Sequence, residues 1–395
     1  MSFEELHESH ASRRDKDNSL TCFARTNFRG GGRVFGIRRS DRRNHMYMIG
    51  KTGVGKSTLL ETLIRQDIEK GEGVALLDPH GDLVDRVLET IPACRRSELI
   101  YFNAPNTTAP LGFNPLEPVT PEKRALAASG LLEVFKKLWI DSWGPRLEHI
   151  LRNALLALFD QPEATLADVT RLMTDKTFRK AAALRITNRR VYDFWIGEFE
   201  GYTPHFRAEA IAPIQNKVGA FLANPLLNRI LTQPRSTFDL RQIMDERKIL
   251  LVNLAKGKIG EDTAALLGAL LVSKLGLAAL SRADVPEHSR RDFYVYVDEF
   301  PNFATLSLAT MLSELRKYRL NLILAHQYFG QLPDELRNAI LGNVGTIISF
   351  RVGPEDADIL EKEFCPEFSA SDLLNLPNRS IELPPIFKPR GAENK

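Results

Sequence analysis

Apolar residues follow two different patterns along this chain. Between residues 46 and 102, short runs of consecutive apolar residues alternate with segments in which apolar residues recur at helical spacing. The runs MYMIG (46–50), GVALLD (73–78) and ELIYF (98–102) are typical of buried strands, and the segments 58–70 and 82–91 of helices. This alternation predicts a parallel sheet covered by helices.

A long stretch in the middle of the chain has only the helical pattern. Residues 103–121 are rich in Asn, Pro and Thr and are expected to form a connection. From 122 to about 245, apolar residues recur at helical spacing and no segment is a convincing strand. Strand patterns return in KILLVNL (248–254), FYVYV (293–297), LNLILA (320–325) and GTIISF (345–350).

These patterns divide the chain into five expected parts. A polar, arginine-rich flexible arm covers 1–32, and Arg33–Ile37 is expected to be a short strand. Residues 33–118 and 246–365 are expected to form the two parts of one α/β domain, and residues 119–245 an all-α domain inserted between them. A proline-rich tail covers 366–395. The expected fold class is therefore α/β, a mainly parallel sheet with helices on both faces and an all-α insertion.

Composition adds little to this picture. The chain has 43% hydrophobic and 26% charged residues, and its net charge of +3 is too small to require a nucleic-acid partner. Its three cysteines form no CxxC pair, which argues against a disulfide framework or a structural zinc site. The longest apolar helix candidate, Thr263–Leu280, is interrupted by Ser273, Lys274 and glycines. We therefore expect a soluble, cytoplasmic protein without a transmembrane segment.

The first candidate site is a phosphate-binding loop. Residues 50–57, GKTGVGKS, fit the pattern G-x-x-x-x-G-K-[ST] between an expected strand and an expected helix. Glycines allow successive backbone N–H groups to turn inward, and the helix N-terminus adds further donors for phosphate. Lys56 is expected to reach the β- and γ-phosphates of ATP, and the Ser57 hydroxyl to bind Mg²⁺. The expected nucleotide-binding residues are Gly50, Lys51, Thr52, Gly53, Val54, Gly55, Lys56, Ser57 and Thr58.

An acidic pair supplies a second candidate. In DFYVYVDEF, five apolar or aromatic residues place Asp298 and Glu299 at the carboxyl end of an expected strand. Parallel sheets have their sites at that edge. Asp298 is expected to hold Mg²⁺, and Glu299 to act as the general base toward the attacking water.

Further polar residues are candidates for the same site. The strand LNLILA is followed by His326, expected to be structural or coupling, and by Gln327, expected to sense the γ-phosphate or the lytic water because an amide both donates and accepts. An arginine finger would also favour hydrolysis. Its candidates are Arg316, Arg319, Arg42 and Arg43, with Arg351 a weaker one, and each is also compatible with an exposed surface residue.

The segment DPHGD at 78–82 has two interpretations. His80 between two carboxylates would suit a metal site, whereas a turn with Asp82 as the helix N-cap is the more ordinary explanation. The sequence favours the turn, because no further ligands cluster nearby.

These motifs together resemble the HerA/FtsK superfamily of ring-forming DNA-pumping ATPases, and within it the coupling proteins of type IV secretion and conjugation, the TraG/TraD-like group. The resemblance rests on DRRNHMYMIGKTGVGKSTLL, GVALLDPHGDLVDRVL, LGFNPLEP, YVYVDEF and LILAHQYFGQL, which span most of residues 33–352. It implies a RecA-like P-loop NTPase core in which Lys56 and Ser57 grip the nucleotide, Asp298 binds the metal, Glu299 is the base and Gln327 the sensor. It also implies an arginine finger at Arg316.

The resemblance further implies an ATPase that forms a hexameric ring and pumps DNA, single- or double-stranded, or nucleoprotein for conjugative or type IV secretion-like transfer. Basic residues of the helical part, Lys136, Lys137, Arg189 and Arg190, are candidates to hold DNA phosphates, although each is equally compatible with a solvated surface. Membrane-embedded coupling proteins begin with transmembrane helices, so this chain is expected either to dock on a membrane-bound secretion or relaxosome partner or to act as a free cytoplasmic translocase. Two alternatives stay open: a HerA-like translocase in repair or defence, and a nucleotide-switched docking module.

Overall fold

A computed structural model describes residues 20–26, 32–108 and 110–383. Its centre is a seven-stranded, entirely parallel sheet with the strand order β5-β6-β4-β7-β8-β3-β9. The strands are β3 (Met46–Ile49), β4 (Gly73–Asp78), β5 (Leu99–Asn103), β6 (Ile249–Asn253), β7 (Phe293–Val297), β8 (Leu320–His326) and β9 (Thr346–Ser349). Every strand predicted from the apolar runs is present, and the parallel sheet is confirmed.

Helices cover both faces of the sheet, which is why most strands are buried along their whole length. On one face, α3 (Lys56–Glu69) and α4 (Asp82–Glu89) pack against Met46, Met48 and Leu76. The other face packs against helices that follow later in the chain. These are α15 (Glu261–Ser281), α16 (Leu306–Leu315) and α17 (Asp334–Asn343).

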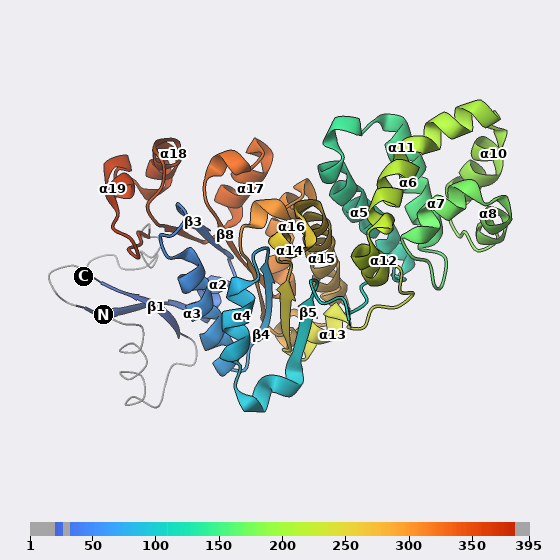
Figure 1. Ribbon diagram of the computed structural model, residues 1–395. Helices are drawn as coiled ribbons and strands as arrows, with labels where there is room; N and C mark the ends of the chain where they lie inside the picture. The colour runs from blue at the N-terminus through green and yellow to red at the C-terminus, as the bar shows by residue number, and fades with distance from the viewer. Residues whose placement is uncertain (1–19, 27–31, 109, 384–395) are drawn as a thin grey trace.

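A helical block stands at one side of the sheet (Figure 1). Between β5 and β6, the described residues contain helices and connections but no strand. The helices are α5 (Arg124–Leu138), α6 (Pro145–Leu158), α7 (Ala167–Thr174), α8 (Lys176–Ala183), α9 (Arg189–Asp193), α10 (Phe199–Gly201), α11 (Pro204–Ala223), α12 (Pro225–Leu231) and α13 (Leu240–Asp245). Figure 1 shows α8 and α10 farthest from the sheet, whereas α5 lies beside α15.

The two ends of the described chain are more ordered than the sequence suggested. Within the expected arm 1–32, β1 (Leu20–Arg25) pairs antiparallel with β2 (Val34–Arg38), and the amide of Gln66 on α3 bonds the backbone of Cys22 in both directions. Residues 1–19 and 27–31 of the arm lie outside the described residues. Within the expected tail, α19 (Ala370–Asn375) follows α18 (Pro354–Phe364), and Glu382 forms a bridge to Ser349 of β9. The remaining helices are α2 (Arg39–Arg42) and α14 (Lys256–Ile259).

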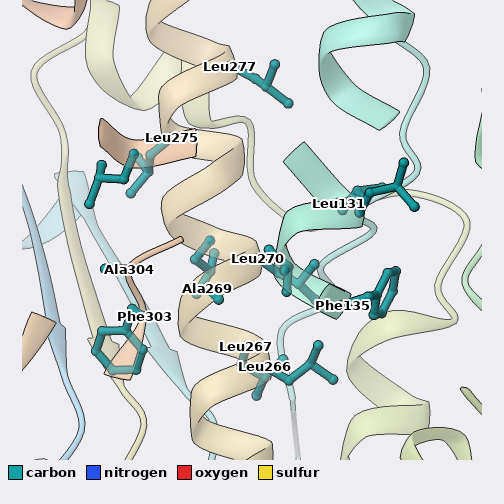
Figure 2. Close-up of a cluster of buried hydrophobic side chains, with 14 of the residues drawn as sticks. Leu131, Phe135, Leu266, Leu267, Ala269, Leu270, Leu275, Leu277, Phe303 and Ala304 are labelled. Carbon is teal, nitrogen blue, oxygen red and sulfur yellow. The ribbon is translucent and has the colours of Figure 1, made fainter. Parts of the chain in front are cut away.

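One helix among the described residues is long and apolar enough to cross a membrane by composition, the segment Glu261–Asp284 that contains α15. In this fold 72% of its most apolar window is buried inside the protein. Leu266, Leu267 and Leu270 pack in the core between the sheet and the helical block (Figure 2). Its hydropathy is therefore explained by its place in the core.

Candidate active site

The candidate site residues follow four neighbouring strands. The P-loop follows β3, Gln327 follows β8, Asp298 follows β7 and Asp78 ends β4, and these strands lie side by side in the order β4-β7-β8-β3. Because parallel strands end at the same edge, segments far apart in the sequence converge there. The structure thus brings together the P-loop, the acidic pair and Gln327.

The P-loop has the backbone that its glycines were expected to allow. Gly53 and Gly55 adopt positive φ values of 78° and 118°, and Gly55 is the N-cap of α3. The Lys56 side chain folds back, and its Nζ donates to the carbonyl oxygens of Gly50 at 2.5 Å and Lys51 at 3.0 Å. Burial lowers the pKa of Lys56, although the nearby Glu299 and Asp298 act in the opposite direction. The ammonium is therefore held by weak neutral acceptors that a phosphate could replace.

Asp298 and Ser57 form an oxygen-rich corner that fits Mg²⁺. The Ser57 hydroxyl donates to Oδ2 of Asp298 at 3.3 Å. Burial raises the pKa of Asp298 to about 6, and the negative charges of Asp78 and Glu299 add to the effect. Lys56 acts in the opposite direction but does not offset these effects, so this carboxylate, next to a hydroxyl, is left short of positive charge. A hydroxyl and a carboxylate are ligands that Mg²⁺ accepts, so the residues present fit the ion.

Glu299 is connected directly to Gln327 and through it to the P-loop. Gln327 Nε2 donates to Glu299 Oε1 at 2.8 Å, and the Thr52 hydroxyl donates to Gln327 Oε1 at 3.0 Å. Glu299 is 9% exposed, and its φ of 46° and ψ of 48° place a non-glycine residue in the left-handed region. Such conformations are strained and often occur at functional sites. One hydrogen-bonded chain therefore joins the candidate base, sensor and nucleotide loop.

His326 has a structural position. Its ring is completely buried, lies 3.2 Å from the Tyr47 hydroxyl and packs against Phe300 and Phe329. Burial lowers its pKa to about 3, so the ring is neutral at physiological pH. These contacts connect β8 with β3 and with the turn after Glu299, in keeping with the structural or coupling role expected from the sequence.

The DPHGD segment is a helix cap formed differently from the expectation. Asp78, not Asp82, supplies the capping carboxylate, which accepts from the backbone N–H groups of Leu83 and Val84. The N-cap position is Gly81, whose φ is 91°. An added Cβ at Gly81 would lie 2.8 Å from Oδ1 of Asn253, so the turn has no room for a larger residue. Among the described residues, no group of three or more His, Cys, Asp or Glu side chains could hold a metal ion.

The arginine candidates lie elsewhere. Arg42 and Arg43 precede β3, and Arg316 and Arg319 precede β8, so all four lie at the amino edge, opposite the P-loop. Arg42 is only 2% exposed and forms a double hydrogen bond with Asp67, at 2.6 and 2.7 Å. This internal ion pair corrects its interpretation as a finger.

The other three arginines differ in how free they are. Arg43 bonds Asp292 at 2.9 Å, and Arg319 lies 3.7 Å from Glu287. Arg316 is exposed and forms no ion pair with the described residues. Arg351, the weaker candidate, follows β9 on the P-loop side of the sheet, where its side chain bonds Asn378. Arg316 is therefore the arginine that a neighbouring molecule could reach with least disruption.

The candidate DNA contacts in the helical block also differ. Lys136, Arg189 and Arg190 are exposed, although Arg189 pairs with Asp193 at 2.9 Å. Lys137 instead points into the protein and donates two hydrogen bonds to backbone carbonyls. Its expected role as a DNA contact is therefore corrected.

A segment near the end of the described chain approaches the P-loop, which the sequence did not predict. The backbone N–H of Arg379 donates to the carbonyl of Val54 at 2.9 Å. The Arg379 side chain also lies beside Gly55. Arg379 has a positive φ of 65°. The proline and asparagine immediately before it favour a turn, but no sequence pattern links this turn to the P-loop.

The parallel sheet, the P-loop after β3 and the acidic pair after β7 define the P-loop NTPase fold. The chain belongs to the family described as type IV secretion-system coupling protein DNA-binding domain, whose model matches residues 33–362. A comparison with curated proteins finds no match. The resemblance to coupling proteins stated from the sequence is thereby confirmed.

Solved structures with the same fold have low sequence identity. The bacterial conjugative coupling protein TrwBdeltaN70 in an unbound form has a TM-score of 0.62 and 17% identity, with 97% of this chain and 89% of that chain covered. The plasmid coupling protein TrwB in complex with ADP and Mg²⁺ has a TM-score of 0.61 and 18% identity over the same shares. VirB4 of Thermoanaerobacter pseudethanolicus has a TM-score of 0.60 and 15% identity, with 92% of each chain covered.

Proposed function

We propose that this protein is an ATP-hydrolysing coupling ATPase that moves DNA, or protein attached to DNA, in conjugative or type IV secretion-like transfer. The observation that carries the proposal is the hydrogen-bonded chain from Thr52 through Gln327 to Glu299, beside the Ser57–Asp298 corner. A loop that only binds a nucleotide needs no base and no sensor. Family membership and the ADP and Mg²⁺ complex of TrwB support the same class of function.

Each residue has a distinct role in this proposal. The backbone N–H groups of the P-loop and the N-terminus of α3 bind the phosphates of ATP, and Lys56 turns from its two carbonyl acceptors toward the β- and γ-phosphates. Ser57 and Asp298 would hold Mg²⁺, which supplies charge neutralisation on the phosphate oxygens. Glu299 accepts a proton from the attacking water, and Gln327 orients that water while contacting Glu299.

The finger would come from a neighbouring subunit. Arg316 is separated from its own P-loop by the length of β8, seven residues or roughly 20 Å. In a hexameric ring, the amino edge of one subunit could instead face the nucleotide of the next. Arg316 would then stabilise negative charge on the transferred phosphoryl group and make hydrolysis depend on the subunit interface.

DNA would be held through its phosphates by exposed cations, including Lys136, Arg189 and Arg190 of the helical block. Phosphate contacts carry little sequence information, so binding should be weakly sequence-dependent and strongly salt-dependent. Movement of the helical block against the sheet would then convert the hydrolysis cycle into movement of DNA.

The test is the rate of ATP hydrolysis with and without DNA over a series of salt concentrations. We expect Mg²⁺-dependent hydrolysis that DNA stimulates most at low salt. Glu299→Gln should bind ATP normally and hydrolyse it at least about a hundredfold more slowly. In the same assay, Arg316→Ala should be slow alone and should regain part of its activity when mixed with Glu299→Gln, because each subunit then supplies what its neighbour lacks.

The results also separate the alternatives. ATP binding that changes assembly, with no hydrolysis above that of Glu299→Gln, would contradict the proposal and favour a nucleotide-switched docking module. Hydrolysis that is indifferent to DNA at every salt concentration would leave the ATPase intact but contradict DNA movement.

A further inference from the structure

Lys137 is a partly buried lysine that forms no ion pair with a carboxylate of the described residues. It lies in the last turn of α5, and its Nζ donates to the carbonyl oxygens of Pro301 at 2.6 Å and Asn302 at 2.8 Å. Burial alone lowers its pKa to about 7, well below the ordinary value for lysine. An ammonium placed at this cost, on two neutral acceptors, calls for an explanation beyond surface solvation.

The two carbonyls belong to the turn that begins at Glu299. Phe300–Asn302 form a single 3-10 turn whose N-cap is Glu299, and the Asn302 N–H donates back to the Glu299 carbonyl at 3.1 Å. The left-handed backbone of Glu299 is therefore fixed from both sides, by β7 before it and by this turn after it. Lys137 fixes the far end of the turn, three residues from the candidate base.

Lys137 comes from the helix that joins the two parts of the molecule. Figure 2 shows α15 between Leu131 and Phe135 of α5 on one side and Phe303 on the other. The helix α15 contacts both neighbours closely. A Cβ added at Gly130 of α5 would lie 2.7 Å from the Ser273 hydroxyl of α15, and one added at Gly268 of α15 would lie 2.1 Å from the Phe303 ring. On its other side, α5 packs against α6 of the helical block. Because α5 belongs to the helical block and also packs against α15, a shift of the block relative to the sheet would displace α5, and Lys137 with it.

We propose that Lys137 is a positioning residue that couples the helical block to the turn after Glu299, and so sets the orientation of the candidate base. This inference rests on the proposed ATPase function of Glu299. An ammonium and a neutral amine both have N–H donors, so the link persists in either protonation state of Lys137. Its loss should change the rate of the chemical step and should leave nucleotide affinity nearly unchanged, because neither carbonyl lies in the P-loop.

The test compares Lys137→Met with Lys180→Met in the full chain. Methionine keeps the length of the side chain but cannot donate a hydrogen bond. Lys180 is an exposed lysine in the last turn of α8, away from the sheet, and has no assigned role. For Lys137→Met we expect a kcat for ATP without DNA that is roughly tenfold lower, with a KM within twofold, and little stimulation by DNA. Lys180→Met should keep the parental kcat. Equal kcat values and equal DNA stimulation in Lys137→Met and the parent would overturn the inference.

A second measurement does not depend on the fold of the variant. Hydrogen–deuterium exchange of the parent should show that DNA alters exchange in peptides covering 299–304 as well as in α5, and bound DNA that leaves 299–304 unchanged would overturn the inference. Failure of the proposed function looks different, because the parent itself would then hydrolyse no more ATP than Glu299→Gln. A parent that hydrolyses ATP while Lys137→Met matches it contradicts the positioning role alone.

Discussion

Asp292 and Asp298 flank the same strand, β7, and both are buried, yet their surroundings have opposite effects on them. At the amino edge, Arg43 and Arg39 bond Asp292 and lower its pKa despite its burial. At the carboxyl edge, burial and the charges of Asp78 and Glu299 raise the pKa of Asp298 to about 6. Two arginines therefore neutralise Asp292, whereas Asp298, six positions later at the other end of the same strand, is left short of positive charge.

The difference separates acids that maintain the fold from an acid available to a ligand. Arg42 and Asp67 repeat the amino-edge arrangement, because both are almost completely buried and form an ion pair with each other. Asp298 lies in a desolvated corner where Lys56 only partly offsets burial and the two neighbouring acids, and a metal ion can relieve the remaining unfavourable interaction. The pairing of each acid therefore indicates its role better than its burial does.

The largest expected effect comes from removing the charge of Asp298. In Asp298→Asn, we expect Mg²⁺-dependent ATP hydrolysis to fall at least about a hundredfold, because a carboxylate ligand of the metal is lost. Stability without nucleotide should not fall, since the repulsion with Asp78 and Glu299 is removed as well. Steady-state ATPase assays and thermal unfolding of the nucleotide-free protein measure the two effects. A variant that is destabilised but fully active would break the comparison.

Asp292→Asn should show the reverse. Losing the charge that Arg39 and Arg43 share should lower the free energy of unfolding by about 2 kcal/mol, while the ATPase rate stays within about twofold of the parent. Denaturant unfolding measures the loss. Asp284→Asn is the matched control, because Asp284 also pairs with an arginine but is 69% exposed, and its removal should change stability little. An inactive, stable Asp292→Asn would show that the amino edge serves the nucleotide site.

The residues at the carboxyl edge could be predicted from the sequence because each is identified by the residues next to it in the chain. Each of the P-loop, the acidic pair and Gln327 directly follows a run of buried residues, and a parallel sheet brings such positions together. Sequence alone thus predicted the sheet, the helical insertion and the positions of the candidate site residues. Their catalytic roles remain predictions.

The rest depended on contacts between distant segments. Arg42 has the same local pattern whether it meets solvent or Asp67, and only the packing of α3 against β7 decides between them. Lys137 likewise fits an exposed helix position until the turn after Glu299 is placed beside it. Asp78 replaced Asp82 as the capping residue because the turn at Gly81 directs the earlier carboxylate toward the first N–H groups of α4. Charged side chains are long enough to choose among several partners, so their spacing in the sequence does not determine the pair.

The smallest expected effect is a difference in pH dependence between the two aspartates. Asp292 has a lowered pKa in the folded state, so its stabilising contribution is present at neutral pH and is lost as the pH falls through the acidic range below 3.8. Asp298 has a raised pKa of about 6, so the nucleotide-free fold favours its protonated form and loses stability as the pH rises from 3.8 to 6.

Mg²⁺ must displace that proton from Asp298. The apparent affinity for Mg²⁺ with ATP should therefore be about tenfold weaker at pH 5 than at pH 7, and Asp298→Asn should lack this dependence. Titration of Mg²⁺ at fixed ATP at both pH values measures it, with Asp292→Asn as the control that keeps the parental profile. The same profile in Asp298→Asn and the parent would show that another group binds the proton, and that Asp298 is neutralised within the fold as Asp292 is.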